Sequence, residues 1–180
     1  RYNVRSNVTS KIGKDISVNL NLSGIMDQKD APSIAFWQIT KEAWRQRPTQ
    51  SIYANDNPDY YSNGIVDGGN AVAYSNSDVV GYQRKISKYF DGSISIDYKF
   101  PVIEGLDLKG FYSYNDVVYD NKVFSKTFNL YTYNSVSDIY SATAYNSPTS
   151  LTRTYYDTSH NMGQLSLNYA HTFNNSHNVS

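Results

Sequence analysis

The sequence predicts an all-β protein, specifically an antiparallel transmembrane β-barrel segment of about five strands from a larger up-and-down barrel, with long extracellular loops. The first observation is that apolar and polar residues alternate with a period of two in several stretches. The second is that short and long connections between these stretches alternate along the chain. The third is the composition of the 180 residues, which combine 15% aromatic residues with a formal net charge of zero.

Residues 1–24 are expected to form the first hairpin. Its second strand has a strictly apolar side, made of Ile16, Val18, Leu20 and Leu22, and a polar side, made of Ser17, Asn19, Asn21 and Ser23. Successive side chains of a strand point to opposite faces, so this strand has one apolar and one wet face. The preceding run alternates more weakly, and Gly13 marks a short turn between the two strands.

Two further segments repeat this pattern. Residues 90–115 are expected to form a second hairpin, with a turn from Pro101 to Gly105 and alternation on both sides of it. Residues 161–180 are expected to form a strand and a turn, with Leu165, Leu167 and Tyr169 on the apolar face and a turn from Asn174 to Asn178.

The connections at residues 25–89 and 116–160 are much longer and are expected to leave the same end of the sheet. Loops of this length in a compact domain are usually functional. In the first, a helix is expected to start near Ser33 as its N-cap and to end before Pro48. In the second, residues 122–133 could extend the strands beyond a membrane.

Two architectures use such strands. A soluble sandwich buries the apolar face against a second sheet, whereas a membrane barrel turns it to lipid and its polar face to a wet lumen. The small polar residues of the wet face, the strand lengths near ten residues and the short turns at one rim favour the barrel. The alternative is a soluble carbohydrate-binding β-sandwich module, which would use exposed aromatic residues as its binding platform.

Composition and motifs exclude several function classes. A neutral chain lacks the basic face that a nucleic-acid-binding protein needs, and no apolar run is long enough for a transmembrane helix. No nucleophile, paired acid and base, or phosphate loop is recognisable, so we expect no catalytic residue, no cofactor and no enzyme activity. The histidines lack zinc-like spacing, and Asp56, Asp59 and Asp67 fit no EF-hand, although a calcium ion in the first long loop stays conceivable.

The ordered set of hairpins resembles SusC/RagA-type TonB-dependent transporters of the Bacteroidetes. The similar segments are Arg1-Tyr2-Asn3-Val4-Arg5-Ser6-Asn7 with Val18-Asn19-Leu20-Asn21-Leu22-Ser23-Gly24, then Phe90-Asp91-Gly92-Ser93-Ile94-Ser95-Ile96-Asp97-Tyr98 with Ile103-Glu104-Gly105-Leu106-Asp107-Leu108-Lys109-Gly110, and Leu165-Ser166-Leu167-Asn168-Tyr169 with His177-Asn178-Val179-Ser180. The resemblance extends over nearly the whole length of the chain, with these segments in the right order.

The resemblance implies a location in the cell outer membrane and a role in importing oligosaccharides, or peptides, together with a SusD-like surface lipoprotein that acts as a lid. A TonB complex would supply energy through parts of the protein outside this segment. Because the chain starts at Arg1 and stops within a repeating pattern, we expect it to be a piece of a longer protein, surrounded by outer-membrane lipid. A passive porin or an outer-membrane enzyme would be the remaining alternatives.

Two sets of residues are candidates for function. The first loop carries aromatic residues that could stack on sugars or contact the lid, or could instead pack the loop upon itself: Trp37, Trp44, Tyr60 and Tyr61. The wet face carries residues expected to face the lumen, either biasing passage or only solvating the wall: Arg5, Asn19, Asn21, Lys99 and Lys109.

Overall fold

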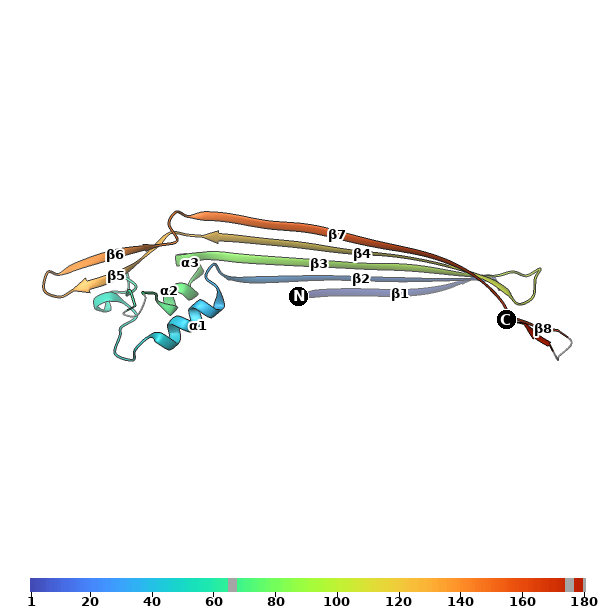
Figure 1. Ribbon diagram of the computed structural model, residues 1–180, viewed down its shortest axis with the longest axis horizontal. Coiled ribbons are helices and arrows are strands. Elements are labelled where there is room, and N and C mark those ends of the chain that lie inside the picture. The colour runs from blue at the N-terminus through green and yellow to red at the C-terminus, as the bar shows by residue number, and fades with distance from the viewer. Residues whose placement is uncertain (65–67, 174–176, 180) are drawn as a thin grey trace. The chain divides into compact units, whose positions relative to one another are not determined.

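The computed structural model describes residues 1–64, 68–173 and 177–179 and consists mostly of antiparallel β-sheet. Five long strands lie side by side in the order β1 (Tyr2–Ile12), β2 (Ile16–Pro32), β3 (Gly81–Lys99), β4 (Leu106–Ser125) and β7 (Ser150–Tyr169) (Figure 1). The all-β prediction is therefore confirmed. Within the described residues the sheet is open, with β1 and β7 at its edges.

The chain divides into two compact units. The strand unit comprises Arg1–Gln28, Ile86–Tyr119 and Tyr155–Ser180, and the loop unit comprises Lys29–Lys85 and Asp120–Thr154. The two connections that the sequence predicts as separate loops thus fold together into one unit. A further small pair, β8 (His171–Phe173) and β9 (His177–Val179), belongs to the strand unit, and residues 174–176 of the expected last turn lie outside the described residues.

In the strand unit, the alternation of the sequence becomes the two faces of the sheet. β1 and β2 pair so that Val8 lies opposite Leu20 and Asn7 opposite Asn21, and Gly13 makes the turn with a φ of 67°. Gly105, with a φ of 86°, closes the expected turn between β3 and β4. The two turns therefore lie within the segments in which the sequence places them, whereas the outer ends of the strands differ.

The strand unit has no buried apolar side chain among the described residues, whereas the loop unit has a core. The buried apolar residues all lie in the loop unit, and its main cluster is Ala73, Val80, Phe128 and Leu130. This cluster joins α2 (Ala71–Ser75) and α3 (Ser77–Val80) to the hairpin of β5 (Phe128–Asn134) and β6 (Ile139–Tyr145). The remaining elements of the unit are α1 (Phe36–Arg45) and the short 3-10 helix η1 (Ala54–Asp56).

The strands reach further than the sequence predicts. Both ends of each long loop expected at 25–89 and 116–160 are therefore strand, and the loops are shorter. β2 continues to Pro32 and β3 already begins at Gly81, while β4 continues to Ser125 and β7 begins at Ser150. Ion pairs between neighbouring strands link these extensions: Arg84 lies 2.6 Å from Asp30, and Arg153 lies 2.8 Å from Asp120. Charged residues hide the period-two pattern, because neither side of such a stretch is apolar.

The expected helix exists but begins later than predicted. Ala35 occupies the N-cap of α1, and the hydroxyl of Ser33, the expected cap, instead donates a hydrogen bond to the carbonyl oxygen of Val80. Ser33 therefore connects the end of β2 to the end of α3 rather than opening the helix. Within the described residues, no helix has the length and hydropathy to cross a membrane.

Candidate functional site

The helix α1 presents an aromatic surface to solvent. Trp37 and Trp44 are seven residues apart, which is close to two helical turns, so both lie on one side of the helix. Their exposed fractions are 62% and 85%, and Phe36 beside them is 82% exposed. The structure therefore brings the two predicted tryptophans together. We call Phe36, Trp37 and Trp44 the aromatic face of α1.

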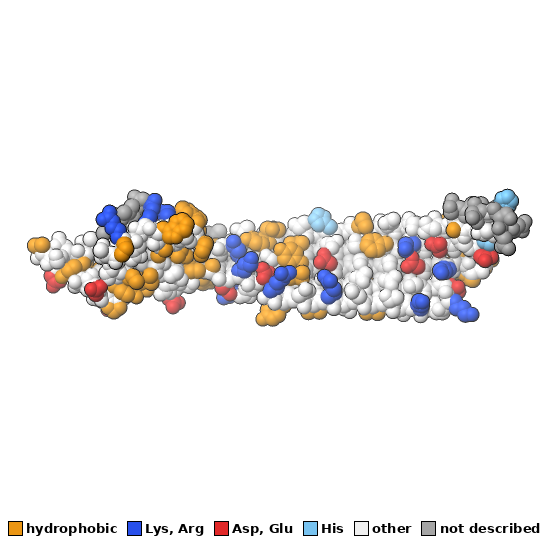
Figure 2. All heavy atoms as spheres, turned by 90° about the horizontal axis from the view of Figure 1, so that it is seen from below, with side chains coloured by type: hydrophobic (Ala, Val, Ile, Leu, Met, Phe, Trp, Pro, Cys, Tyr) orange, Lys and Arg blue, Asp and Glu red, His pale blue; other side chains and the backbone are white. Residues whose placement is uncertain are grey.

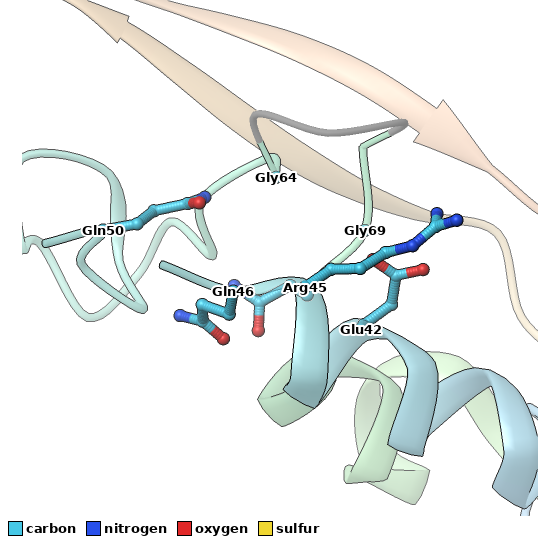
Figure 3. Close-up of a pocket in the computed structure, with 7 residues that line it drawn as sticks. Glu42, Arg45, Gln46, Gln50, Gly64 and Gly69 are labelled. Atoms are coloured by element: carbon cyan, nitrogen blue, oxygen red, sulfur yellow. The ribbon is translucent and has the colours of Figure 1, made fainter. Parts of the chain in front are cut away.

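The opposite side of α1 is anchored by a carboxylate. Glu42 is only 7% exposed and pairs with Lys41 at 3.1 Å, while Gly69 lies so close that a Cβ there would be 2.7 Å from the Glu42 Oε2 atom (Figure 3). The Lys41 ammonium also lies 5.5 Å from the centre of the Trp37 ring. A surface helix normally buries its apolar side, whereas α1 leaves the three residues of its aromatic face exposed to solvent.

The cavity beside Glu42 does not provide room for a substrate. It is lined by Glu42, Arg45, Gln46, Gln50, Gly64, Gly69 and Asn70 (Figure 3). Its volume of about 10 Å³ is close to that of a single water probe. A water molecule is therefore the largest species that this cavity could hold.

Tyr60 and Tyr61 lie elsewhere, where the two connections meet. The Tyr60 ring is 4.7 Å from that of Tyr131 and 4.5 Å from that of Tyr140. The backbone carbonyl of Tyr61 accepts a 2.8 Å hydrogen bond from the Tyr131 amide, and its ring lies 5.2 Å from that of Tyr53. These contacts support the interpretation in which the two tyrosines pack the loop upon itself.

Asn70 is a structural residue that the sequence analysis did not identify. It is 3% exposed, and its Oδ1 accepts hydrogen bonds from the amides of Val72 and Ala73 while its Nδ2 donates to the carbonyls of Ile52 and Ser62. One side chain thus caps α2 and ties it to the preceding loop. An asparagine directly before a short apolar run is a typical N-cap signal and could have revealed it.

The polar face of the strand unit has its own hydrogen-bond network. Asn19 accepts from Thr9 at 2.9 Å and donates to Ser95 at 3.2 Å, and Asn21 donates to Ser93 at 3.3 Å. These bonds join the polar sides of β1, β2 and β3.

The three predicted basic residues of this face differ in their surroundings. Lys109 pairs with Asp97 at 3.3 Å. Arg5 and Lys99 are exposed, and the described part of the chain gives neither side chain a partner. The sheet thus combines paired and unpaired charges on one polar surface, and Figure 2 shows positive and negative side chains interspersed on one face of the molecule.

The residues considered for calcium do not form a cluster where the structure describes them. Asp56 accepts a 2.6 Å hydrogen bond from Ser51, and the Asp59 amide donates to Asn57 at 3.1 Å. Asp67 lies outside the described residues. Among those described, no group of three His, Cys, Asp or Glu side chains is placed to hold a metal ion.

Tyr74 gives the loop unit an expected sensitivity to alkali. Its burial, followed by the nearby Tyr145 and Glu42, raises the pKa of Tyr74 to about 12 from a model-compound value of 10.0. Because the folded protein holds this proton more tightly, the stabilisation is complete below pH 10 and is lost as the pH rises towards 12. We expect Tyr74→Phe to flatten the pH dependence of unfolding between pH 10 and 12. Denaturant unfolding of the variant and the parent protein at several pH values in this range would measure the free energy of unfolding. If this free energy changed equally with pH in both proteins, the raised pKa of Tyr74 would be contradicted.

No protein-family model matches the sequence, and no curated protein matches it.

Proposed function

We propose that the chain is part of the wall and of the extracellular loops of a TonB-dependent outer-membrane transporter. The observation that carries this proposal is the uncovered apolar face of the five-stranded sheet. Val4 and Val8 of β1 and Leu165 and Leu167 of β7 are 51–74% exposed. A soluble sandwich would bury such residues against a second sheet, whereas a barrel wall would present them to lipid.

The opposite face and the edges of the sheet support the same proposal. The side of β2 away from Leu20 carries hydroxyl and carboxamide groups, which suit a hydrated lumen. Both β1 and β7 leave one side without a neighbouring strand in the described sheet, and a closed barrel would supply those neighbours from other parts of the transporter. The side of β4 that carries Tyr112 and Tyr114 continues with Asp116, Val118, Asp120 and Lys122 and so becomes more polar, as expected where a strand leaves the membrane.

The role of the loop unit in this proposal is capture. Import of oligosaccharides or peptides with a SusD-like lipoprotein requires a surface that the lid or the substrate can contact. The aromatic face of α1 offers Trp37 and Trp44 for this contact, because most of each side chain is exposed. Tyr60 and Tyr61 would support the loop unit from inside.

Membrane topology tests the proposal directly. Single cysteines at Leu20 and Asn21 would be introduced into the intact protein and probed with a lipid-soluble and a water-soluble thiol reagent. We expect Leu20→Cys to react from lipid and Asn21→Cys only from water, since neighbouring residues point to opposite faces. This chain contains no cysteine that could interfere. A soluble protein in which Leu20→Cys is protected from both reagents would instead favour the carbohydrate-binding sandwich.

Removing the aromatic face should impair capture without unfolding the loop unit. For Trp37→Ala combined with Trp44→Ala, we expect a loss of at least about tenfold in lipoprotein co-purification or in substrate uptake, since exposed aromatic residues often dominate an interface. Thermal unfolding should change little, because both side chains are exposed in the free protein. The contrasting control is Tyr60→Ala. It should lower the temperature of unfolding of the loop unit, because the Tyr60 ring packs against Tyr131 and Tyr140. Unchanged co-purification and uptake in the tryptophan variant would exclude the aromatic face as a contact surface.

A further inference from the structure

The loop unit contains a chemically labile pair of residues. Asn63 is the one asparagine of the chain that is followed by glycine. Asparagine is a thermolabile residue, and a following glycine makes it more reactive, because glycine has no Cβ that would hinder attack on the asparagine side chain. In this reaction the backbone nitrogen of Gly64 forms a bond to Cγ of Asn63, and ammonia leaves with the amide proton. Water then opens the succinimide ring at either carbonyl carbon, which yields aspartate or isoaspartate.

The fold requires the glycine that makes this pair reactive. A Cβ at position 64 would lie 2.7 Å from the carbonyl oxygen of Gly69 and 2.8 Å from that of Gly68. Both neighbours are backbone atoms of a closely packed segment, which cannot swing aside as the end of a long side chain can. A larger residue at position 64 would slow the reaction but would also displace this segment.

The closed loop unit restrains both reacting groups. The Gly64 amide donates a 2.9 Å hydrogen bond to the carbonyl of Gly69, and loss of the amide proton would break it. The Asn63 Oδ1 accepts from the Tyr145 hydroxyl at 2.8 Å and from the Gly69 amide at 3.4 Å. The Asn63 Nδ2 donates to the Thr143 hydroxyl at 3.5 Å, and departure of ammonia would break this bond as well. The reaction must therefore give up several native hydrogen bonds before it gains any.

The same bonds join the first connection to the β5–β6 hairpin. The Asn63 amide donates to the carbonyl of Tyr131 on β5 at 2.8 Å, while the side-chain partners Thr143 and Tyr145 belong to β6. An aspartate could keep the side-chain contacts, since both hydroxyl groups can donate to a carboxylate. Isoaspartate instead adds one carbon to the main chain, so the amides of residues 63 and 64 can no longer both reach their partners.

We propose that Asn63 is a modification site controlled by the fold. It is protected from deamidation while the loop unit is closed and deamidates when the unit opens, and isoaspartate at this position then weakens the junction between the two connections. The proposal concerns the loop unit alone and is independent of the transporter proposal.

Deamidation rates of the intact protein test the control by the fold. Samples would be incubated at mildly alkaline pH, and peptide mass spectrometry would separate asparagine, aspartate and isoaspartate at position 63. We expect the parent protein unfolded in urea to react at least about tenfold faster than the folded protein, because a reaction that needs opening follows the open population. Tyr145→Phe should react several-fold faster than the folded parent protein, because Oδ1 of Asn63 loses its hydroxyl donor.

The matched control is Tyr140→Phe. It removes a hydroxyl group that accepts a 3.2 Å hydrogen bond from Asn55 in the same unit, and it should leave the rate at Asn63 unchanged. Equal rates in the folded and unfolded parent protein, or equal rates in Tyr145→Phe and Tyr140→Phe, would overturn the control by the fold.

Proteolysis of a partly deamidated sample under native conditions tests the consequence. We expect chains with isoaspartate at position 63 to be cleaved within the loop unit several-fold faster than the asparagine chains of the same sample. If both forms were cleaved at the same rate, the modification would leave the junction intact and its proposed effect would be wrong.

Discussion

Replacing Leu130 by alanine is expected to destabilise the loop unit by about 3 kcal/mol, the usual cost of removing a buried leucine side chain. Leu130 is 0% exposed and packs with Ala73, Val80 and Phe128, which come from both of the long connections. The neighbouring Tyr131 exchanges backbone hydrogen bonds of 2.8 Å with Tyr61 and Asn63. A cavity at Leu130 should therefore loosen both connections together.

Native-state proteolysis of the intact protein would measure this effect. If cleavage follows opening of the loop unit, a loss of about 3 kcal/mol corresponds to roughly a hundredfold faster cleavage. The control is Val136→Ala, which removes an apolar side chain that is 96% exposed in the same unit and should leave the rate unchanged. Equal cleavage of the Leu130→Ala and parent proteins would contradict a shared core for the two connections.

Periodicity located the strands but could not locate their ends. The alternation around Leu20 and around Leu108 is visible because one face is apolar and the other polar. It disappears near Asp30 and Arg153, where charged residues make cross-strand pairs that no local pattern records. The extension of the strands there depends on pairs of residues that are far apart in sequence. A pattern read over a short stretch of the chain includes only one member of each pair.

The candidate site was predicted in part. The tryptophans of α1 could be identified as exposed candidates, but the burial of Glu42 on the other side of the helix could not, because it depends on Gly69 from another segment. Tyr60 and Tyr61 are aromatic loop residues like Trp37, and only the fold of the β5–β6 hairpin against them separates a packing role from a contact role. Residue type alone does not carry that information.

Gly81→Ala is expected to disrupt the junction between α3 and β3. Gly81 has a φ of 92° and a ψ of −171°, a backbone conformation that is almost restricted to glycine. A Cβ at this position would also overlap the backbone carbonyl of Phe124. The junction is further held by hydrogen bonds from the Lys126 amide to Val80 at 3.0 Å and from the Ser33 amide to Gly81 at 3.1 Å. The extra methyl group must therefore displace β4 or distort the chain.

The expected cost of Gly81→Ala is about 3 kcal/mol, at the upper end of the range for a strained backbone position. The same proteolysis assay should show roughly a hundredfold faster cleavage in the loop unit. The matched control is Gly24→Ala in β2, because no atom lies within 4 Å of a Cβ there, and alanine at such a site is neutral or stabilising by about 0.5 kcal/mol. If both variants were cleaved like the parent protein, Gly81 could not be the point at which β4 restrains the start of β3. A large effect of Gly81→Ala alone would show that the loop unit depends on close backbone contact at this junction as well as on its apolar core.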